Sequence, residues 1–149
     1  MLSVHSDEHF MKEAFKEAQL AYEEGEIPVG AVVVSKNRII AKAHNMVERL
    51  NDVTAHAEML AITAAANTLG GKYLNECTLY VTLEPCSMCG GATSWSQLGK
   101  LVYGASDSKR GCLRLEPSVL HPKTEVVSGV MKTECEALIN DFFANLRKD

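Results

Sequence analysis

The chain has 149 residues, of which 46% are hydrophobic and 23% charged, and its formal net charge is −4. These values are close to those of an ordinary soluble globular protein, and the length suits one domain, over residues 1–149, with a core large enough to be stable by itself. The longest apolar runs, such as residues 29–34, are too short to cross a bilayer. The acidic charge argues against a general nucleic-acid-binding surface but leaves room for a local one.

The first half of the chain predicts a helix, a hairpin and a second helix. Residues 7–24 carry apolar side chains at helical spacing. Residues 29–34 and 38–45 are rich in β-branched side chains and are joined by a short polar connection, which predicts a β-hairpin. Residues 54–69 predict an Ala- and Leu-rich helix with Thr54 as its N-cap.

The second half alternates strands and helices. Residues 77–83 form a nearly continuous apolar run, which predicts a central strand buried on both faces. The remaining predicted elements are a helix over 87–98, a strand over 100–105, an irregular stretch over 106–122, a short strand within 124–130 and a helix over 132–146. This order predicts a mixed sheet with helices on both faces, a three-layer α/β/α domain.

The N-terminus and the number of cysteines indicate the cellular compartment of the chain. Residues 1–15 lack a basic segment followed by an apolar one, so we expect no secretory signal and a cytoplasmic location. Five cysteines, an odd number, argue against a disulfide framework in such a chain. We expect Cys77, Cys112 and Cys135 to fill space in the core.

The other two cysteines, Cys86 and Cys89, have C-x-x-C spacing and straddle the start of a predicted helix. The unpaired N–H groups of a helix N-terminus favour the thiolate form, which is the form that binds a metal. This pair is compatible with a zinc site, a redox pair or two buried cysteines.

His56 and Glu58 lie two residues apart at the head of another predicted helix. Side chains at this spacing do not face each other along the flank of a helix. If the two residues cooperate, they therefore lie in its opening turn. The simpler interpretations are a core histidine and a glutamate that interacts favourably with the helix dipole.

One zinc site would account for both stretches. His56, Cys86 and Cys89 supply three ligands, whereas structural zinc sites normally have four. The open position of a hydrolytic zinc holds water and lowers its pKa to about 7. Glu58, which is not needed as a ligand, is the candidate to move the proton.

The combined pattern, H-A-E followed about thirty residues later by P-C-S-M-C, is a known signature of zinc-dependent nucleobase deaminases. The chain resembles the bacterial tRNA-specific adenosine deaminases of the cytidine-deaminase-like superfamily. The similar segments are EIPVGAVVV, NDVTAHAEMLAI, TLYVTLEPCSMC, LVYGASD and the closing DFF.

The resemblance implies a cytidine-deaminase-like fold with a five-stranded sheet and one Zn²⁺ per subunit of a homodimer, without membrane association. It implies hydrolysis of adenosine to inosine at the wobble position of a tRNA, recognised through its anticodon stem-loop. Attack at C6 of a flipped-out adenine would release ammonia, and anticodon bases are already largely unpaired, so extrusion costs less than in a duplex.

By the same resemblance, His56, Cys86 and Cys89 bind zinc and Glu58 is the proton shuttle. Asn45 hydrogen-bonds the target base, and Asp107 helps to hold the RNA. The alternatives are that Asn45 ends its strand in a turn and that Asp107 caps a loop.

The chain departs from the family pattern in the segments that would touch RNA. Ser106 stands where the family commonly has arginine, and Trp95 and Gln97 lie in a segment that often reads differently. We expect Trp95 to pack on an apolar helix face, with base stacking as the alternative.

Two other functions fit the zinc pattern. A deaminase of a free nucleobase or nucleoside, such as guanine, cytosine or cytidine, would share both motifs. A non-catalytic, zinc-stabilised binding module is the second alternative, but such a site has no use for Glu58 beside an open ligand position.

Overall fold

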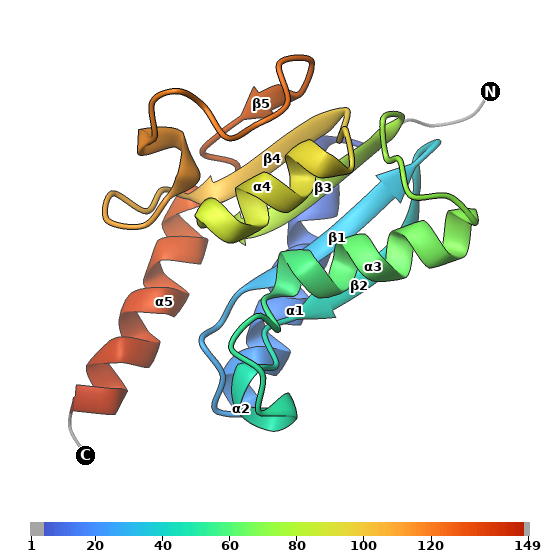
Figure 1. Cartoon of the computed structure of the whole chain (residues 1–149). Helices are drawn as coiled ribbons and strands as arrows, with labels where there is room; N and C mark the ends of the chain where they lie inside the picture. The colour runs from blue at the N-terminus through green and yellow to red at the C-terminus, as the bar shows by residue number, and fades with distance from the viewer. Residues whose placement is uncertain (1–4, 148–149) are drawn as a thin grey trace.

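The computed structural model describes residues 5–147, and apart from the one-turn helix α2 its elements follow the predicted order (Figure 1). The helices are α1 (Asp7–Glu23), α2 (Val47–Leu50), α3 (Ala57–Leu69), α4 (Ser87–Trp95) and α5 (Lys132–Arg147), with a 3₁₀ turn at Cys112–Arg114. The strands are β1 (Gly30–Ser35), β2 (Arg38–His44), β3 (Cys77–Leu83), β4 (Lys100–Ala105) and β5 (Glu125–Val127). Residues 1–4 and 148–149, which the predicted domain includes, lie outside the described residues.

The five strands form one mixed sheet in the order β2-β1-β3-β4-β5. Strand β1 pairs antiparallel with both β2 and β3, whereas β3, β4 and β5 are parallel. The predicted hairpin is confirmed: Lys36 and Asn37 connect β1 to β2 with φ angles of 50° and 62°, as in the two-residue turns that match the twist of paired strands. The prediction of a central strand over residues 77–83 is also confirmed.

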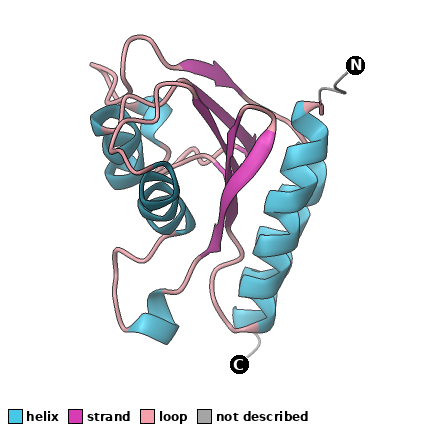
Figure 2. Ribbon diagram, turned by 90° about the vertical axis from the view of Figure 1, so that its right-hand side faces the viewer, coloured by secondary structure: helices cyan, strands magenta, loops and turns pink. Residues whose placement is uncertain are grey.

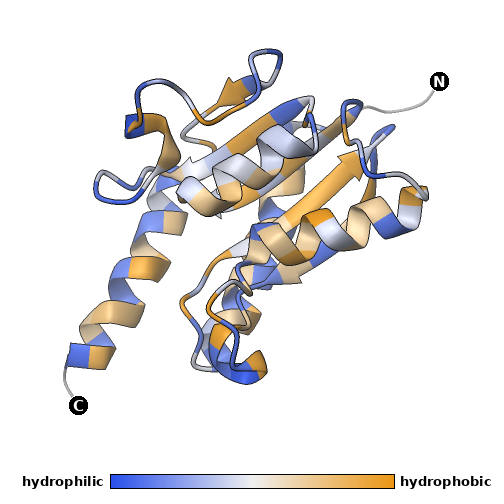
Figure 3. Cartoon of the chain, viewed as in Figure 1, coloured by the Kyte–Doolittle hydropathy of each residue, from blue (hydrophilic) through white to orange (hydrophobic). Residues whose placement is uncertain are grey.

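Helices cover both faces of the sheet, so the predicted three-layer arrangement is confirmed. Helices α3 and α4 lie on one face, and α1 and α5 lie on the other (Figures 1 and 2). Successive side chains of β1 alternate between two apolar clusters: Ala31 and Val33 pack beneath α3, and Val32 and Val34 pack against α1. This double burial explains why β1 is hydrophobic along most of its length (Figure 3). Among the described residues, none of the helices has the length and apolar character needed to span a membrane.

Helix α3 begins later than predicted, and Thr54 is not its N-cap. The Thr54 amide and hydroxyl donate hydrogen bonds to Asp52 Oδ1 at 2.8 and 2.7 Å, so Thr54 belongs to the preceding turn. The residue at the N-cap is His56. A short polar side chain that bonds a nearby carboxylate competes with helix capping in this way.

Helix α4 ends earlier than predicted, and the predicted packing of Trp95 is wrong. Gln97 adopts a φ of 55°, and the amide of Leu98 donates to Thr93 O at 3.0 Å, which closes the helix at Trp95. Trp95 is 86% exposed. It follows the buried Thr93 by two residues, which places it about 200° around the helix from that side chain.

Candidate metal centre and active-site cavity

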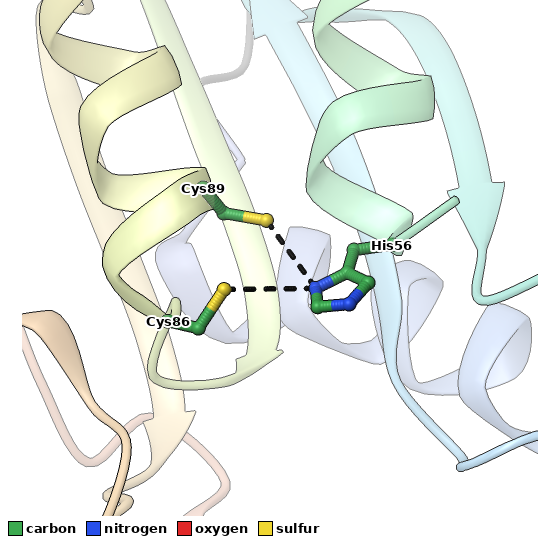
Figure 4. Close-up of side chains that lie close together, drawn as sticks. All are labelled: His56, Cys86 and Cys89. Atoms are coloured by element: carbon green, nitrogen blue, oxygen red, sulfur yellow. Dashed lines mark hydrogen bonds between the residues drawn. The ribbon is translucent and has the colours of Figure 1, made fainter. Parts of the chain in front are cut away.

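The candidate zinc ligands come from the N-termini of two neighbouring helices. His56 is the N-cap residue of α3, Cys86 is the N-cap residue of α4, and Cys89 lies in the first turn of α4. Their side chains point toward one another across the space between the two helices (Figure 4). The expectation that the site lies at helix ends rather than on a helix flank therefore agrees with the structure.

The spacing of the three side chains suits a single metal ion. His56 Nδ1 lies 3.6 Å from Cys86 Sγ and 3.6 Å from Cys89 Sγ, and the three potential ligand atoms lie within 4.8 Å of one another. Zinc bonds of about 2.3 Å to sulfur and about 2.05 Å to nitrogen, at tetrahedral angles, separate the two ligand atoms by about 3.6 Å. One imidazole and two thiolates are also donors that zinc prefers.

The two thiols are not equivalent. The Cys89 thiol donates a hydrogen bond to Cys86, and this bond, followed by that from His56, lowers the pKa of Cys86 to about 3. The same Cys86–Cys89 bond, together with burial, raises the pKa of Cys89. The hydrogen bond with Cys86 raises the pKa of His56. These hydrogen bonds therefore favour the thiolate form at Cys86 over Cys89.

Glu58 lies in the first turn of α3 and is only 4% exposed. Burial raises the pKa of Glu58 to about 7, while its own backbone amide and His56 act in the opposite direction. Glu58 lines the same cavity as His56 and Cys86. A carboxyl with a pKa near neutrality is suited to accept a proton and return it.

Asn45 directly follows β2, is buried and lines the cavity. Its Oδ1 accepts a hydrogen bond from the backbone amide of Ala57 at 2.7 Å. The side chain therefore ties the end of β2 to the start of α3, next to His56.

Asp107 caps the loop after β4, as its alternative interpretation proposed. Its Oδ1 accepts hydrogen bonds from the amides of Lys109 and Arg110 at 3.1 and 3.0 Å. The same loop forms a wall of the cavity, to which Ser106 and both cationic residues contribute. Asp107 therefore shapes the wall on which it lies.

The cavity has a volume of about 930 Å³, which is in the usual range for ligand sites. One wall of the cavity belongs to α5 and was not predicted from the sequence; its residues are Ile139, Phe142, Phe143 and Leu146. The only sequence signal for this wall is helical apolar spacing, and this spacing does not distinguish a cavity wall from a buried core face. Two buried glutamates also line the cavity and were not predicted as site residues, namely Glu26 and Glu84.

Comparison with known proteins agrees with this arrangement. Residues 4–105 match the family model described as the cytidine and deoxycytidylate deaminase zinc-binding region. The chain belongs to this deaminase family. The match includes the H-A-E and P-C-S-M-C stretches, so the three candidate ligands lie within the family's zinc-binding region.

Individual relatives of this chain indicate a subgroup within the deaminase family. The chain is 49% identical over 147 residues to the tRNA-specific adenosine deaminase of Bacillus subtilis (strain 168), an alignment that covers 95% of this chain and 91% of the relative. A solved structure from a study of A-to-I editing by tRNA:A34 deaminases is 42% identical, with a TM-score of 0.82 and coverage of 87% of this chain and 98% of that chain. A guanine deaminase from Bacillus subtilis is 41% identical, with a TM-score of 0.66, but covers 68% of this chain and 66% of that one. The resemblance to the tRNA-specific adenosine deaminases is confirmed.

Proposed function

We propose that this chain is a zinc-dependent hydrolase that converts adenosine to inosine at the wobble position of a tRNA anticodon. The observation that carries the proposal is the buried carboxyl of Glu58 beside one imidazole and two thiols at zinc-binding distances, in a cavity lined by His56, Glu58 and Cys86. The coverage of 91% of a tRNA-specific adenosine deaminase supports this choice of substrate.

His56, Cys86 and Cys89 would hold one zinc ion per subunit. When bound there, zinc would supply Lewis-acid activation of water for attack at C6 of adenine. The N-termini of α3 and α4, at which these residues lie, would orient the three side chains toward the ion.

Glu58 would act as the proton shuttle. Its carboxylate accepts a proton from the attacking water, and the resulting acid delivers it toward the amino group that leaves as ammonia. Adenosine and water thereby become inosine and ammonia, and Glu58 returns to its starting state. Burial helps because it brings the pKa of the carboxyl close to the pH at which the reaction proceeds.

Asn45 and Asp107 would orient the substrate. Asn45 is buried beside the ligands and would hydrogen-bond the target base. Asp107 would help to hold the RNA near the target nucleotide, on the wall that also carries the exposed Lys109 and Arg110. Cations on this wall would attract the phosphates of an anticodon loop despite the acidic net charge of the chain.

We also propose that two copies of the chain associate as a homodimer. The exposed indole of Trp95 supports this, because a large aromatic side chain that is 86% exposed on a short helix is typical of an interface. Sedimentation measurements on the wild type and on Trp95→Gln test the proposal. A wild-type monomer at micromolar concentration would reject it.

A substrate panel tests the catalytic proposal. Zinc content and ammonia release are measured with an anticodon stem-loop and with free guanine, cytosine and cytidine. Guanine is included because a guanine deaminase is similar in structure, and cytosine and cytidine because the chain matches the cytidine and deoxycytidylate deaminase family. We expect deamination of the stem-loop and no release from the free compounds. The reverse pattern would reject tRNA as the substrate, and a lack of turnover in the zinc-loaded protein would favour a binding module.

A further inference from the structure

We infer that Glu84 is a positioning residue that anchors the cationic wall of the cavity to the turn carrying the cysteine ligands. This inference rests on the proposed function, since it assigns the wall a role in holding the RNA. Glu84 directly follows β3, precedes Pro85 and Cys86, and is 7% exposed.

The carboxylate of Glu84 bonds both ends of the loop after β4. Its Oε1 accepts a hydrogen bond from the amide of Asp107 at 3.0 Å, and its Oε2 accepts one from the amide of Leu113 at 3.1 Å. A buried carboxylate is costly unless hydrogen-bond donors surround it, and here two backbone amides serve that need. Each oxygen therefore holds one end of residues 107–113.

The middle of the loop wraps closely around the same carboxylate. A Cβ added to Gly111 would lie within 2.2 Å of Glu84 Cδ, so only glycine fits there. The amide of Cys112 donates to Pro85 O at 2.8 Å, and Gly111 forms a bridge with Cys86. Backbone contacts therefore hold the loop against Pro85 and against Cys86, which is a candidate zinc ligand.

A second contact holds the loop against α4. A Cβ on Gly90 would lie 2.8 Å from Cys112 Cβ and 2.9 Å from its sulfur, so Cys112 packs directly on the first turn of the helix. Cys112 is buried, and this burial raises the pKa of its thiol to about 11. It acts here as an apolar contact rather than as a thiolate ligand.

The outer side of this loop forms the cavity wall. Asp107 turns the chain by accepting from the amides of Lys109 and Arg110, and all three residues line the cavity. Glu84 thus connects the turn that carries the candidate cysteine ligands to Lys109 and Arg110, the lysine and arginine among the described residues that line the cavity. Loss of the Glu84 carboxylate would therefore free Lys109 and Arg110 to move, while all three candidate zinc ligands remain.

The test compares Glu84→Gln with the double variant Lys109→Ala/Arg110→Ala on an anticodon stem-loop. Glutamine keeps one acceptor oxygen but turns an NH₂ group toward the second backbone donor. We expect Glu84→Gln to retain zinc, to raise KM about tenfold and to change kcat by less than about threefold. The salt dependence of KM should become shallower, as in the double variant, because fewer cations would be held near the phosphates.

Combining the substitutions separates positioning from general destabilisation. Adding Glu84→Gln to the double variant should raise KM little further, since the wall has already lost its charge. Lys72→Ala serves as the control, because it removes an exposed cation that does not line the cavity. Two results would overturn the inference. One is that Glu84→Gln loses zinc while KM and its salt dependence stay unchanged, and the other is that the effects of Glu84→Gln and of the double variant on KM are fully additive.

Hydrogen exchange tests the anchor in the wild type and covers the case in which Glu84→Gln does not fold. The amides of Asp107 and Leu113 should exchange slowly, and Glu84→Asp, whose shorter side chain retains both acceptors, should speed their exchange. Exchange of these amides in the wild type as fast as in an exposed loop would contradict the anchor. If the wild type leaves the stem-loop unreacted, the proposed function fails, while this measurement still decides the role of Glu84.

Discussion

The side-chain oxygen of Asn45 accepts a hydrogen bond from the backbone amide of Ala57, 2.7 Å away. Ala57 is the first residue of α3, and its amide is one of the N–H groups that a helix N-terminus leaves without an intrahelical partner. Asn45 therefore caps α3 from a distance, a role that the N-cap residue His56 does not perform, since its side chain makes no capping hydrogen bond. Because Asn45 caps α3, the imidazole of His56 remains available to contact the sulfur atoms of Cys86 and Cys89.

Asn45→Ala should lower both stability and activity. The substitution leaves the buried Ala57 amide without its acceptor, so we expect a loss of about 1–3 kcal/mol in the free energy of unfolding. Because α3 carries both His56 and Glu58, kcat/KM should also fall. Chemical denaturation and steady-state kinetics measure the two effects. Asn45→Asp retains an acceptor and serves as the control, and unchanged stability in Asn45→Ala would contradict the capping role.

Glu58→Gln should separate metal binding from turnover. The amide keeps the size of the side chain but cannot take up a proton, so we expect a loss of about 10²–10⁴-fold in kcat. Zinc content should stay equal to that of the wild type, because Glu58 is not among the proposed ligands. Metal analysis beside kinetics gives both quantities. Activity near the wild-type value would reject the proton-shuttle role.

The pH dependence of the reaction should have an acidic limb set by Glu58. Only the carboxylate accepts a proton, so kcat/KM should rise as pH increases through the pKa of this group. Burial raises that pKa from 4.5 to about 7, and a bound cation lowers it again. The midpoint should therefore lie between 4.5 and about 7. A profile that stays flat over this interval in the wild type would argue against Glu58 as the base.

Stability of the zinc-stripped protein should change with pH in the opposite direction. Because the folded state raises the pKa of Glu58, it binds the proton more tightly than the unfolded chain does. The contribution of this group favours the folded state below pH 4.5 and is lost as pH rises to about 7. Denaturation of the stripped wild type and of stripped Glu58→Gln, compared over this interval, isolates the effect. Equal pH slopes for the two proteins would contradict it.

Metal removal should expose one cysteine selectively. The pKa of Cys86 is lowered to about 3, whereas burial raises the pKa of Cys135 to about 12. At pH 6, iodoacetamide should therefore modify Cys86 in the chelator-treated protein and leave Cys135 unmodified. Zinc-loaded protein should be protected at Cys86. Peptide mass mapping locates the label, and equal labelling with and without the chelator would argue against Cys86 as a ligand.

The core of the fold could be predicted from local patterns. The bounds of β3 and β4 agree with the prediction because a strand buried on both faces must be apolar at successive positions, and residues 77–83 and 100–105 satisfy this requirement. Helix ends were harder to place. Thr54 has the chemistry of an N-cap, but Asp52, two residues earlier, forms a turn with it that the sequence does not distinguish from a cap.

The three candidate ligands were identified from the combined H-A-E and P-C-S-M-C pattern, which resembles the zinc signature of the nucleobase deaminases. The exposure of Trp95 was predicted wrongly. It depends on the length of α4 and on which face of α4 packs against the sheet. Apolar character by itself does not decide between a core, an interface and a cavity wall, since all three bury the same kinds of side chain from water.

The amino-acid sequence alone predicted the candidate zinc ligands, the candidate proton shuttle and the segments that form the sheet. The tertiary structure decided the distances between His56 and the two sulfurs, the α5 wall of the cavity and the contact of Glu84 with residues 107–113. The difference lies in the sequence separation of the residues that interact. Ligand chemistry and strand propensity depend on neighbours in the chain, whereas burial and hydrogen bonding across the cavity depend on the packing of segments that are far apart in sequence.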